Sequence, residues 1–167
     1  MTLSAAQLQK IWLLSDTVLY PEAVSFLHKL MREQECDPLP ASQVAGLLSI
    51  ADSQKYDELY RYVVHQRERD WPPARRDLKT FYTALEQVFS LMQRKRLKDE
   101  FHLLTAGSGE GGRSVSEIRQ EADELMAVLA REFIQHLLAE NGVLATQKAE
   151  ERARQKTSRR EGSYGNR

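Results

Sequence analysis

The sequence lacks the features that several large protein classes require. It contains one cysteine, Cys36, among 167 residues, which excludes an internal disulfide framework and fits a reducing cytosol. No apolar run approaches the roughly 18 residues that suggest a membrane span, and the N-terminus has no basic region followed by an apolar one, as a signal peptide would. We therefore expect a cytoplasmic protein that does not enter a membrane.

Net charge and strand patterning are also missing. Lys and Arg together number 24, as do Asp and Glu, so the formal net charge is +0. Nucleic-acid binding would then have to depend on local clusters of cations and not on attraction by the whole chain. β-Branched residues are sparse and no segment alternates convincingly between polar and apolar side chains, although Phe101–Thr105 could form a strand.

The pattern that is present is helical. Asp77–Leu104 carries an apolar stripe with the 3.6-residue period of a helix, follows Pro72 and Pro73, and ends at the glycine-rich run Ala106–Gly112. We expect this segment to be the longest helix and the one around which the chain is organised.

Other segments show the same periodicity and carry start and stop signals. Capping boxes predict helix starts at Ser4 with Gln7 and at Ser114 with Glu117. Pro21 is expected to begin a second helix, and a third is expected near Ser42–Ala51. In that third helix, Gly46 either weakens the helix or lets a neighbour come close. A fourth helix is expected to be capped by Asp52 or Ser53, and the last core helix to stop at Asn141-Gly142.

These signals predict an all-α protein. A single bundle of five or six helices would occupy residues 1–145, and a basic, disordered tail would occupy residues 146–167. From Lys148 to Arg167 there are seven Lys/Arg, three Asp/Glu and almost no apolar residue, which is typical of a frayed or disordered segment. We expect this tail and the loop Ala106–Arg113 to be mobile.

No catalytic, metal or cofactor site stands out. Gly107–Ser114 is a near miss to a phosphate-binding loop, with Arg113 in place of the lysine, and we interpret it as a glycine-rich linker. Cys36 has no visible histidine partner and is interpreted as a partly buried thiol. We therefore predict no enzymatic activity and no cofactor. The four histidines occur singly and are interpreted as satisfied surface or edge residues: His28, His65, His102 and His136.

A cluster of cations is the better functional signal. It lies within nineteen residues and straddles the turn Trp71-Pro72-Pro73, which would bring the ends of two helices together. Its members are Arg61, Arg67, Arg69, Arg75, Arg76 and Lys79. Guanidinium groups bind phosphate and stack on bases, and Trp71, Tyr60 and Tyr62 could add stacking. The alternative is a solvated helix end whose charges pair with Glu68, Asp70 and Asp77.

Two segments resemble the helical small subunit of type III CRISPR effector complexes. They are LPASQVAGLL at residues 39–48 and DLKTFYTAL at residues 77–85. The family often shows a helix start similar to Thr-Ser-Gln-Leu-Arg-x-Phe-Tyr, which this chain divides between the two segments. Ser42-Gln43 supplies the polar opening without the aromatic pair. Lys79, Phe81 and Tyr82 supply the basic residue and the aromatics without the preceding Ser-Gln. The resemblance covers residues 39–104.

This resemblance implies a non-catalytic subunit. Copies would stack along the guide RNA–target RNA duplex, bind its backbone without sequence specificity and contact other subunits of the effector complex. The RNA-binding residues expected from the cluster, of which Lys79 also falls within the matched motif, are Arg67, Arg69, Arg75, Arg76 and Lys79, with Arg94 and Lys95 as a second group. The rival interpretation is a helical protein-interaction adaptor or antitoxin-like module without nucleic-acid contact, and a nucleotide-binding enzyme is a distant third.

Overall fold

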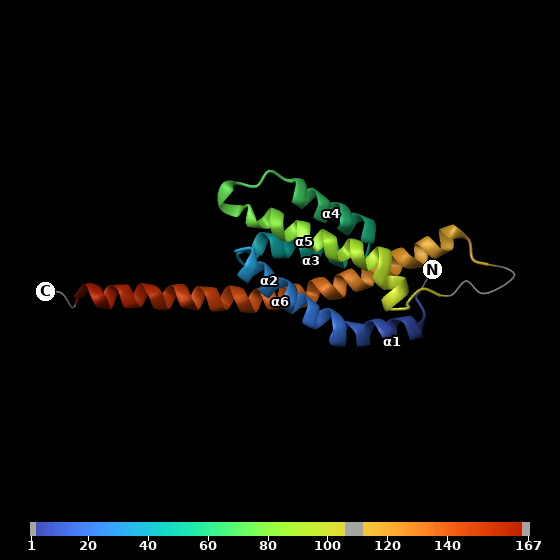
Figure 1. Cartoon of the computed structure of the whole chain (residues 1–167), viewed down its shortest axis with the longest axis horizontal. Coiled ribbons are helices and arrows are strands. Elements are labelled where there is room, and N and C mark those ends of the chain that lie inside the picture. The colour runs from blue at the N-terminus through green and yellow to red at the C-terminus, as the bar shows by residue number, and fades with distance from the viewer. Residues whose placement is uncertain (1–2, 106–111, 165–167) are drawn as a thin grey trace.

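A computed structural model describes residues 3–105 and 112–164, with side chains described as far as Gly162. Every regular element in these two ranges is helical, which confirms the all-α prediction (Figure 1). In chain order they are α1 (Ala5–Leu14), the π-helix η1 (Ser15–Leu19), α2 (Tyr20–Glu33), α3 (Ala41–Asp52), α4 (Tyr56–Glu68), the 3-10 helix η2 (Pro73–Arg75), α5 (Asp77–Leu91), the π-helix η3 (Met92–Glu100) and α6 (Val115–Tyr164). No described helix combines the length and apolar character of a bilayer span.

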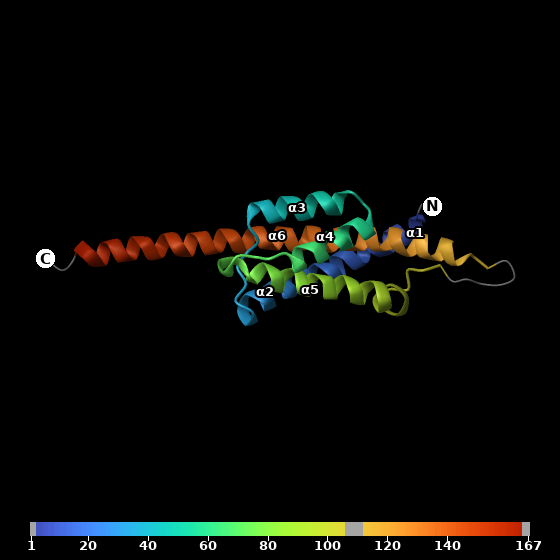
Figure 2. The ribbon, with the colours of Figure 1, turned by 90° about the horizontal axis from the view of Figure 1, so that it is seen from above.

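The bundle is built along the first half of α6. Figures 1 and 2 show α2, α3 and α5 beside this half of α6, whereas its second half projects from the bundle. α5 and α6 supply the largest share of the core, because their apolar stripes face each other and the other helices. Burying each such side chain stabilises the fold by about 1.5–3 kcal/mol. The largest of these fully buried side chains are Tyr82, Leu85, Phe89, Leu125, Met126 and Phe133.

The longest helix is α6, with 50 residues, and not the predicted Asp77–Leu104. That segment is helical only as far as Glu100, where η3 ends. The predicted stop at Asn141-Gly142 was also wrong. Oδ1 of Asn141 accepts from the backbone N–H of Leu39 at 2.7 Å, and its Nδ2 donates to the Leu39 carbonyl at 3.2 Å. A tertiary contact therefore occupies the side chain, and α6 continues past it.

The structure also differs from the expected disordered tail, because α6 continues to Tyr164. No proline interrupts residues 146–164, and Ala, Glu, Gln, Lys and Arg have high helix propensity. All side chains of residues 149–162 are exposed, so this half of α6 adds nothing to the core. Residues 165–167 of the expected tail, and residues 106–111 of the expected mobile loop, lie outside the described residues.

Pro21 lies in the first turn of α2, as the sequence predicted, but η1 joins α1 to α2 in one continuous rod. Proline has no N–H to donate and clashes with an ordinary preceding α-helical turn. The wide turn of η1 comes just before it, with the N–H of Tyr20 bonded to the carbonyl of Ser15. Such π-bulges accommodate a break in the α-helical ladder without ending the helix. Since η1 joins α1 to α2, the six α-helices of the described residues form five rods.

Two short-range predictions, the capping box at Ser4 and a close helix contact at Gly46, are confirmed. In the capping box at Ser4, its Oγ accepts from Gln7 N at 3.1 Å and Gln7 Oε1 accepts from Ser4 N at 2.9 Å. A Cβ built at Gly46 would lie 2.6 Å from the Tyr62 hydroxyl, so this glycine lets α4 approach α3 closely. The expected cap of α4 at Asp52 or Ser53 was wrong, because α4 begins at Tyr56 without a side-chain cap.

Candidate nucleic-acid interface

The predicted cation cluster lies where α4 turns into α5. The Tyr56 hydroxyl bonds Gln93 and the Tyr60 hydroxyl bonds Glu86, so the two helices run antiparallel. Residues 69–76 close the turn, held by Trp71, whose Nε1 donates to the carbonyl of Gln66 at 2.7 Å. Figure 1 shows this turn at the end of the bundle from which α6 projects. The sequence prediction that the turn gathers the cations at one end is therefore correct for residues 67–79.

Two of the cations are held by carboxylates. Nη1 of Arg67 lies 2.5 Å from Glu86 and its Nη2 lies 2.9 Å from Glu68. Arg75 donates two parallel hydrogen bonds to Asp77, from Nε to Oδ1 at 3.1 Å and from Nη2 to Oδ2 at 3.0 Å. Such fork-like pairs are the strongest that arginine makes, and a phosphate would have to compete with them. For these two arginines the paired, solvated helix end is the better description.

Three other cations remain open to a ligand. Arg69, Arg76 and Lys79 are exposed, and no ion pair within the described residues joins them to an acid. The Arg69 guanidinium lies 4.5 Å from the centre of the Trp71 ring. These residues surround a hollow of about 510 Å³, completed by Glu68, Asp70 and Thr80. Since Glu68 is already paired with Arg67, Asp70 is the acid that opposes an anion there.

The remaining predicted residues do not join this hollow. Arg61 bonds Asp57 at 3.2 Å. Arg94 and Lys95 lie in η3, beyond the other end of α5 and about 20 Å along the helix from Lys79. The ring of Tyr62 packs against Tyr82, with 6.4 Å between ring centres, and Tyr60 bonds Glu86, so Trp71 is the aromatic residue of the predicted set that lines the hollow.

Sequence reasoning missed a second group of cations beside the cluster. Lys148 of α6 bonds Asp37, and a hollow of about 210 Å³ brings Asp37 together with Arg75, Lys148 and Arg152. The hydrogen bond from Lys148 outweighs burial and lowers the pKa of Asp37. The sequence assigned these α6 residues to a disordered tail. Their spacing of four residues was the signal that could have placed them on a helix.

The cysteine and histidines that the sequence offered as possible nucleophile or metal ligands include Cys36, His28 and His136, and each of these contacts other residues of the fold. Cys36 is buried, and burial together with Asp77 and Asp37 raises its pKa to about 11, so the thiol is neutral at neutral pH. Nε2 of His28 lies 2.8 Å from Glu140, and Nε2 of His136 lies 2.7 Å from the Ser15 hydroxyl. No three His, Cys, Asp or Glu side chains of the described residues converge in a way that could hold a metal ion.

The two segments that carry the family resemblance meet in the fold. The Tyr82 hydroxyl donates to Oε1 of Gln43 at 2.7 Å, joining α5 to α3. Phe81 and Tyr82 are both buried, so the aromatic pair holds helices together. Comparison of the chain with protein-family models, curated proteins and solved structures finds no match. The resemblance to type III CRISPR small subunits therefore stays a prediction.

Proposed function

We propose that this protein is a non-catalytic helical subunit that binds the RNA backbone without sequence preference. In the terms of the family resemblance, it would be the small subunit of a type III CRISPR effector complex, beside the guide RNA–target RNA duplex. The observation that supports this function is the hollow at the α4–α5 turn, where Arg69, Arg76 and Lys79 are exposed around Trp71 and form no ion pair with an acid of the described residues.

The chemistry of the hollow suits phosphate. Exposed cations that keep their donors free can bind a phosphodiester, and the contact releases condensed counterions, so affinity falls steeply with salt. The chain has no net charge, and the isolated protein is expected to bind weakly near physiological salt. Copies held in register by neighbouring subunits would bind more tightly through their raised effective concentration.

A salt titration of RNA binding by the purified chain tests this function. The variant Arg69→Gln, Arg76→Gln, Lys79→Gln should bind more weakly, and its log–log salt slope should fall by about 0.7–0.9 for each phosphate that it no longer neutralises. The matched control removes three exposed cations at other sites: Lys55→Gln, Lys98→Gln, Arg119→Gln. Equal affinities and slopes for the two triple variants would refute binding at this hollow.

Asp70 offers a test in the opposite direction. Its carboxylate shares the hollow with the three cations and repels phosphate. Asp70→Asn should therefore strengthen RNA binding, whereas Asp99→Asn, which removes another exposed charge in η3, should leave it unchanged. Because both changes are isosteric, circular dichroism should be the same for both. A loss of affinity in Asp70→Asn would mean that the hollow does not receive an anion.

A second candidate function, protein binding, is favoured by exposed apolar surface. Trp12, Leu13 and Tyr20 form a ridge on α1 and α2 with exposed fractions of 59%, 64% and 50%, beside the exposed Asp16. Between α2 and α5 lies a groove of about 670 Å³ with Lys29 and Lys79 among its lining residues. Its apolar lining is Phe26, Leu30, Ala84, Val88 and Leu91. We propose that the ridge of a second copy occupies this groove, with Asp16 opposite these lysines, and such a head-to-tail contact builds an open stack.

Sedimentation velocity over a range of protein concentrations tests the stack. Wild type should associate, whereas Leu13→Glu on the ridge and Leu91→Glu in the groove should each stay monomeric. Ser49→Glu, an exposed change on α3, is the matched control and should associate like wild type. A mixture of the two monomeric variants should form a dimer and nothing larger, because one intact ridge and one intact groove remain. Monomeric wild type at every concentration would refute the stack.

A further inference from the structure

The C-terminal arm of α6, residues 148–162, is a lone helix that projects from the bundle (Figures 1 and 2). It carries six Lys/Arg and three Glu. Because the whole chain has 24 Lys/Arg and 24 Asp/Glu, the rest of the chain has more acidic than basic residues. At 1.5 Å per residue the arm is about 22 Å long. A helix with no apolar side to bury gains little from packing, so the charged side chains of the arm are available to a ligand.

The charges of the arm are sorted onto two faces. At 100° per residue, five cations fall within about 120° of the helix circumference. Glu150, Arg154 and Glu161 lie on the opposite side, and Glu151 lies between the two faces. The five, which we name the stripe, are Lys148, Arg152, Lys156, Arg159 and Arg160. From its first to its last residue the stripe extends about 18 Å along the helix.

The stripe continues onto the bundle. Arg75, Lys148 and Arg152 line one hollow around Asp37, and Arg76, the next residue after Arg75, lines the hollow of the α4–α5 turn. Lys148 is bonded to Asp37, which fixes the base of the arm, and the cations beyond it are exposed. The exposed cations of the arm and those of the α4–α5 turn therefore lie at the same end of the bundle, on either side of the pairs that Lys148 forms with Asp37 and Arg75 with Asp77.

The composition of the arm indicates which class of partner it can bind. A protein partner is usually held by buried aromatic or aliphatic anchors, and a membrane by an apolar helix face, but residues 148–162 contain no apolar residue larger than alanine. Single-stranded nucleic acid is held by aromatic stacking platforms, which this segment also lacks. A duplex, by contrast, presents one phosphate per about 1.7 Å of its axis and needs only cations to meet it. Duplex RNA in particular is bound largely by its shape and backbone.

We propose that the arm binds the phosphate backbone of an RNA duplex through its stripe. This inference rests on the proposed function and adds to it a second binding element, the arm. The arm lies along the duplex with the stripe inward and with Glu150 and Glu161 towards solvent. The α4–α5 turn binds the same backbone at the base of the arm.

The free arm carries a built-in repulsion that a duplex relieves. Arg152 and Lys156, and Lys156 and Arg160, are like charges four residues apart, which destabilise a helix. Phosphates along the stripe neutralise these pairs, so the duplex should make the arm more rigid. Hydrogen exchange of backbone amides in residues 149–162 of the full chain should slow when an RNA duplex longer than the arm is added. Exchange should not slow with an equal charge of polyglutamate.

A matched pair of single changes tests the orientation of the arm. Lys156→Gln removes one charge from the stripe, and Arg154→Gln removes one from the opposite face, both with a good helix former. Lys156→Gln should weaken binding of the RNA duplex and lower the salt slope by about 0.9, whereas Arg154→Gln should leave the slope unchanged. Equal salt slopes for the two variants would overturn the inference. It would also be overturned if polyglutamate or single-stranded RNA slowed hydrogen exchange in the arm as much as the RNA duplex does.

Two triple variants separate this inference from the proposed function. Arg152→Gln, Lys156→Gln, Arg159→Gln removes three of the five cations of the stripe, and Arg69→Gln, Arg76→Gln, Lys79→Gln removes the three open cations of the turn. If only the stripe variant loses RNA affinity, the arm is the binding element and the assignment to the turn fails. If only the turn variant loses affinity, the inference is overturned and the proposed function stands. Losses in both variants support both, and a loss in neither refutes both.

Discussion

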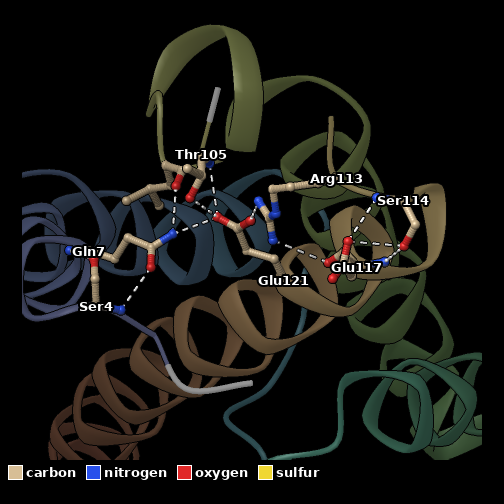
Figure 3. Close-up of polar contacts among 8 residues, drawn as sticks. Ser4, Gln7, Thr105, Arg113, Ser114, Glu117 and Glu121 are labelled. Atoms are coloured by element: carbon tan, nitrogen blue, oxygen red, sulfur yellow. Dashed lines mark hydrogen bonds and ion pairs between the residues drawn. The ribbon is translucent and has the colours of Figure 1, made fainter. Parts of the chain in front are cut away.

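Nε2 of Gln7 donates a 2.7 Å hydrogen bond to Oε1 of Glu121, which lies 114 residues later in the chain. The same carboxylate oxygen accepts from the backbone N–H of Thr105 at 2.9 Å and from its hydroxyl at 2.7 Å, while Arg113 bonds the other oxygen (Figure 3). Glu121 is 4% exposed. One buried carboxylate thus joins the start of α1, the segment after η3 and the first turns of α6.

Removing this charge should destabilise the fold. Glu121→Gln keeps the shape of the side chain but replaces an acceptor of several hydrogen bonds by an amide that cannot accept them all. We expect the free energy of unfolding to fall by about 1–3 kcal/mol, measured by urea denaturation. Glu150→Gln, an exposed change on the same helix, should alter it by less than about 0.5 kcal/mol. Equal stability of the two variants would show that the network contributes nothing.

The same carboxylate predicts a dependence on pH. Burial would raise the pKa of Glu121, but the hydrogen bonds from Thr105, Arg113 and Gln7 outweigh it, and the pKa lies below its ordinary value of 4.5. A lowered folded-state pKa contributes stability above the unfolded-state value, and this contribution is lost as the pH falls through the folded-state value. The difference in stability between wild type and Glu121→Gln should therefore be constant at neutral pH and shrink below about pH 4.5. A difference that widened in acid would contradict this assignment.

Asn141 and its neighbour should respond to substitution with opposite signs. Asn141→Leu leaves the backbone N–H and carbonyl of Leu39 without their bonds, and a buried unsatisfied group costs about 1–3 kcal/mol. A Cβ at Gly142 would meet nothing within 4 Å, so Gly142→Ala should stabilise α6 by about 0.5–1 kcal/mol through helix propensity. Thermal or urea unfolding measures both. A stabilising Asn141→Leu would mean that the fold does not need this tie to Leu39.

The contact between Gly46 and Tyr62 can be measured by a double-mutant cycle. Gly46→Ala alone should destabilise, because its Cβ would lie 2.6 Å from the Tyr62 hydroxyl and α3 or α4 would have to shift. In a Tyr62→Phe background that hydroxyl is gone, and Gly46→Ala should then gain up to about 1 kcal/mol from helix propensity. The coupling between the two changes should therefore be favourable, and additive effects would exclude the close approach.

The sequence by itself determined what depends on residues a few positions apart. The 3.6-residue spacing of Leu78, Phe81, Tyr82 and Leu85 identified a helix, and the pairing of Ser4 with Gln7 located the start of α1. Both signals work because a helix brings residues three and four positions apart onto one face. The all-α class follows from them, as does the gathering of Arg69, Arg76 and Lys79 at a turn with two prolines.

Only the tertiary structure decided what depends on contacts between distant residues. Arg67 and Arg69 are close together in the sequence, yet Glu86 reaches Arg67 from α5 and leaves Arg69 open, because the packing of two helices chooses the partner of each cation. Asn141 continues α6 where its local preference is to end a helix, because Leu39 occupies its side chain. In each case the deciding group lies more than ten residues away, where a local pattern carries no information about it.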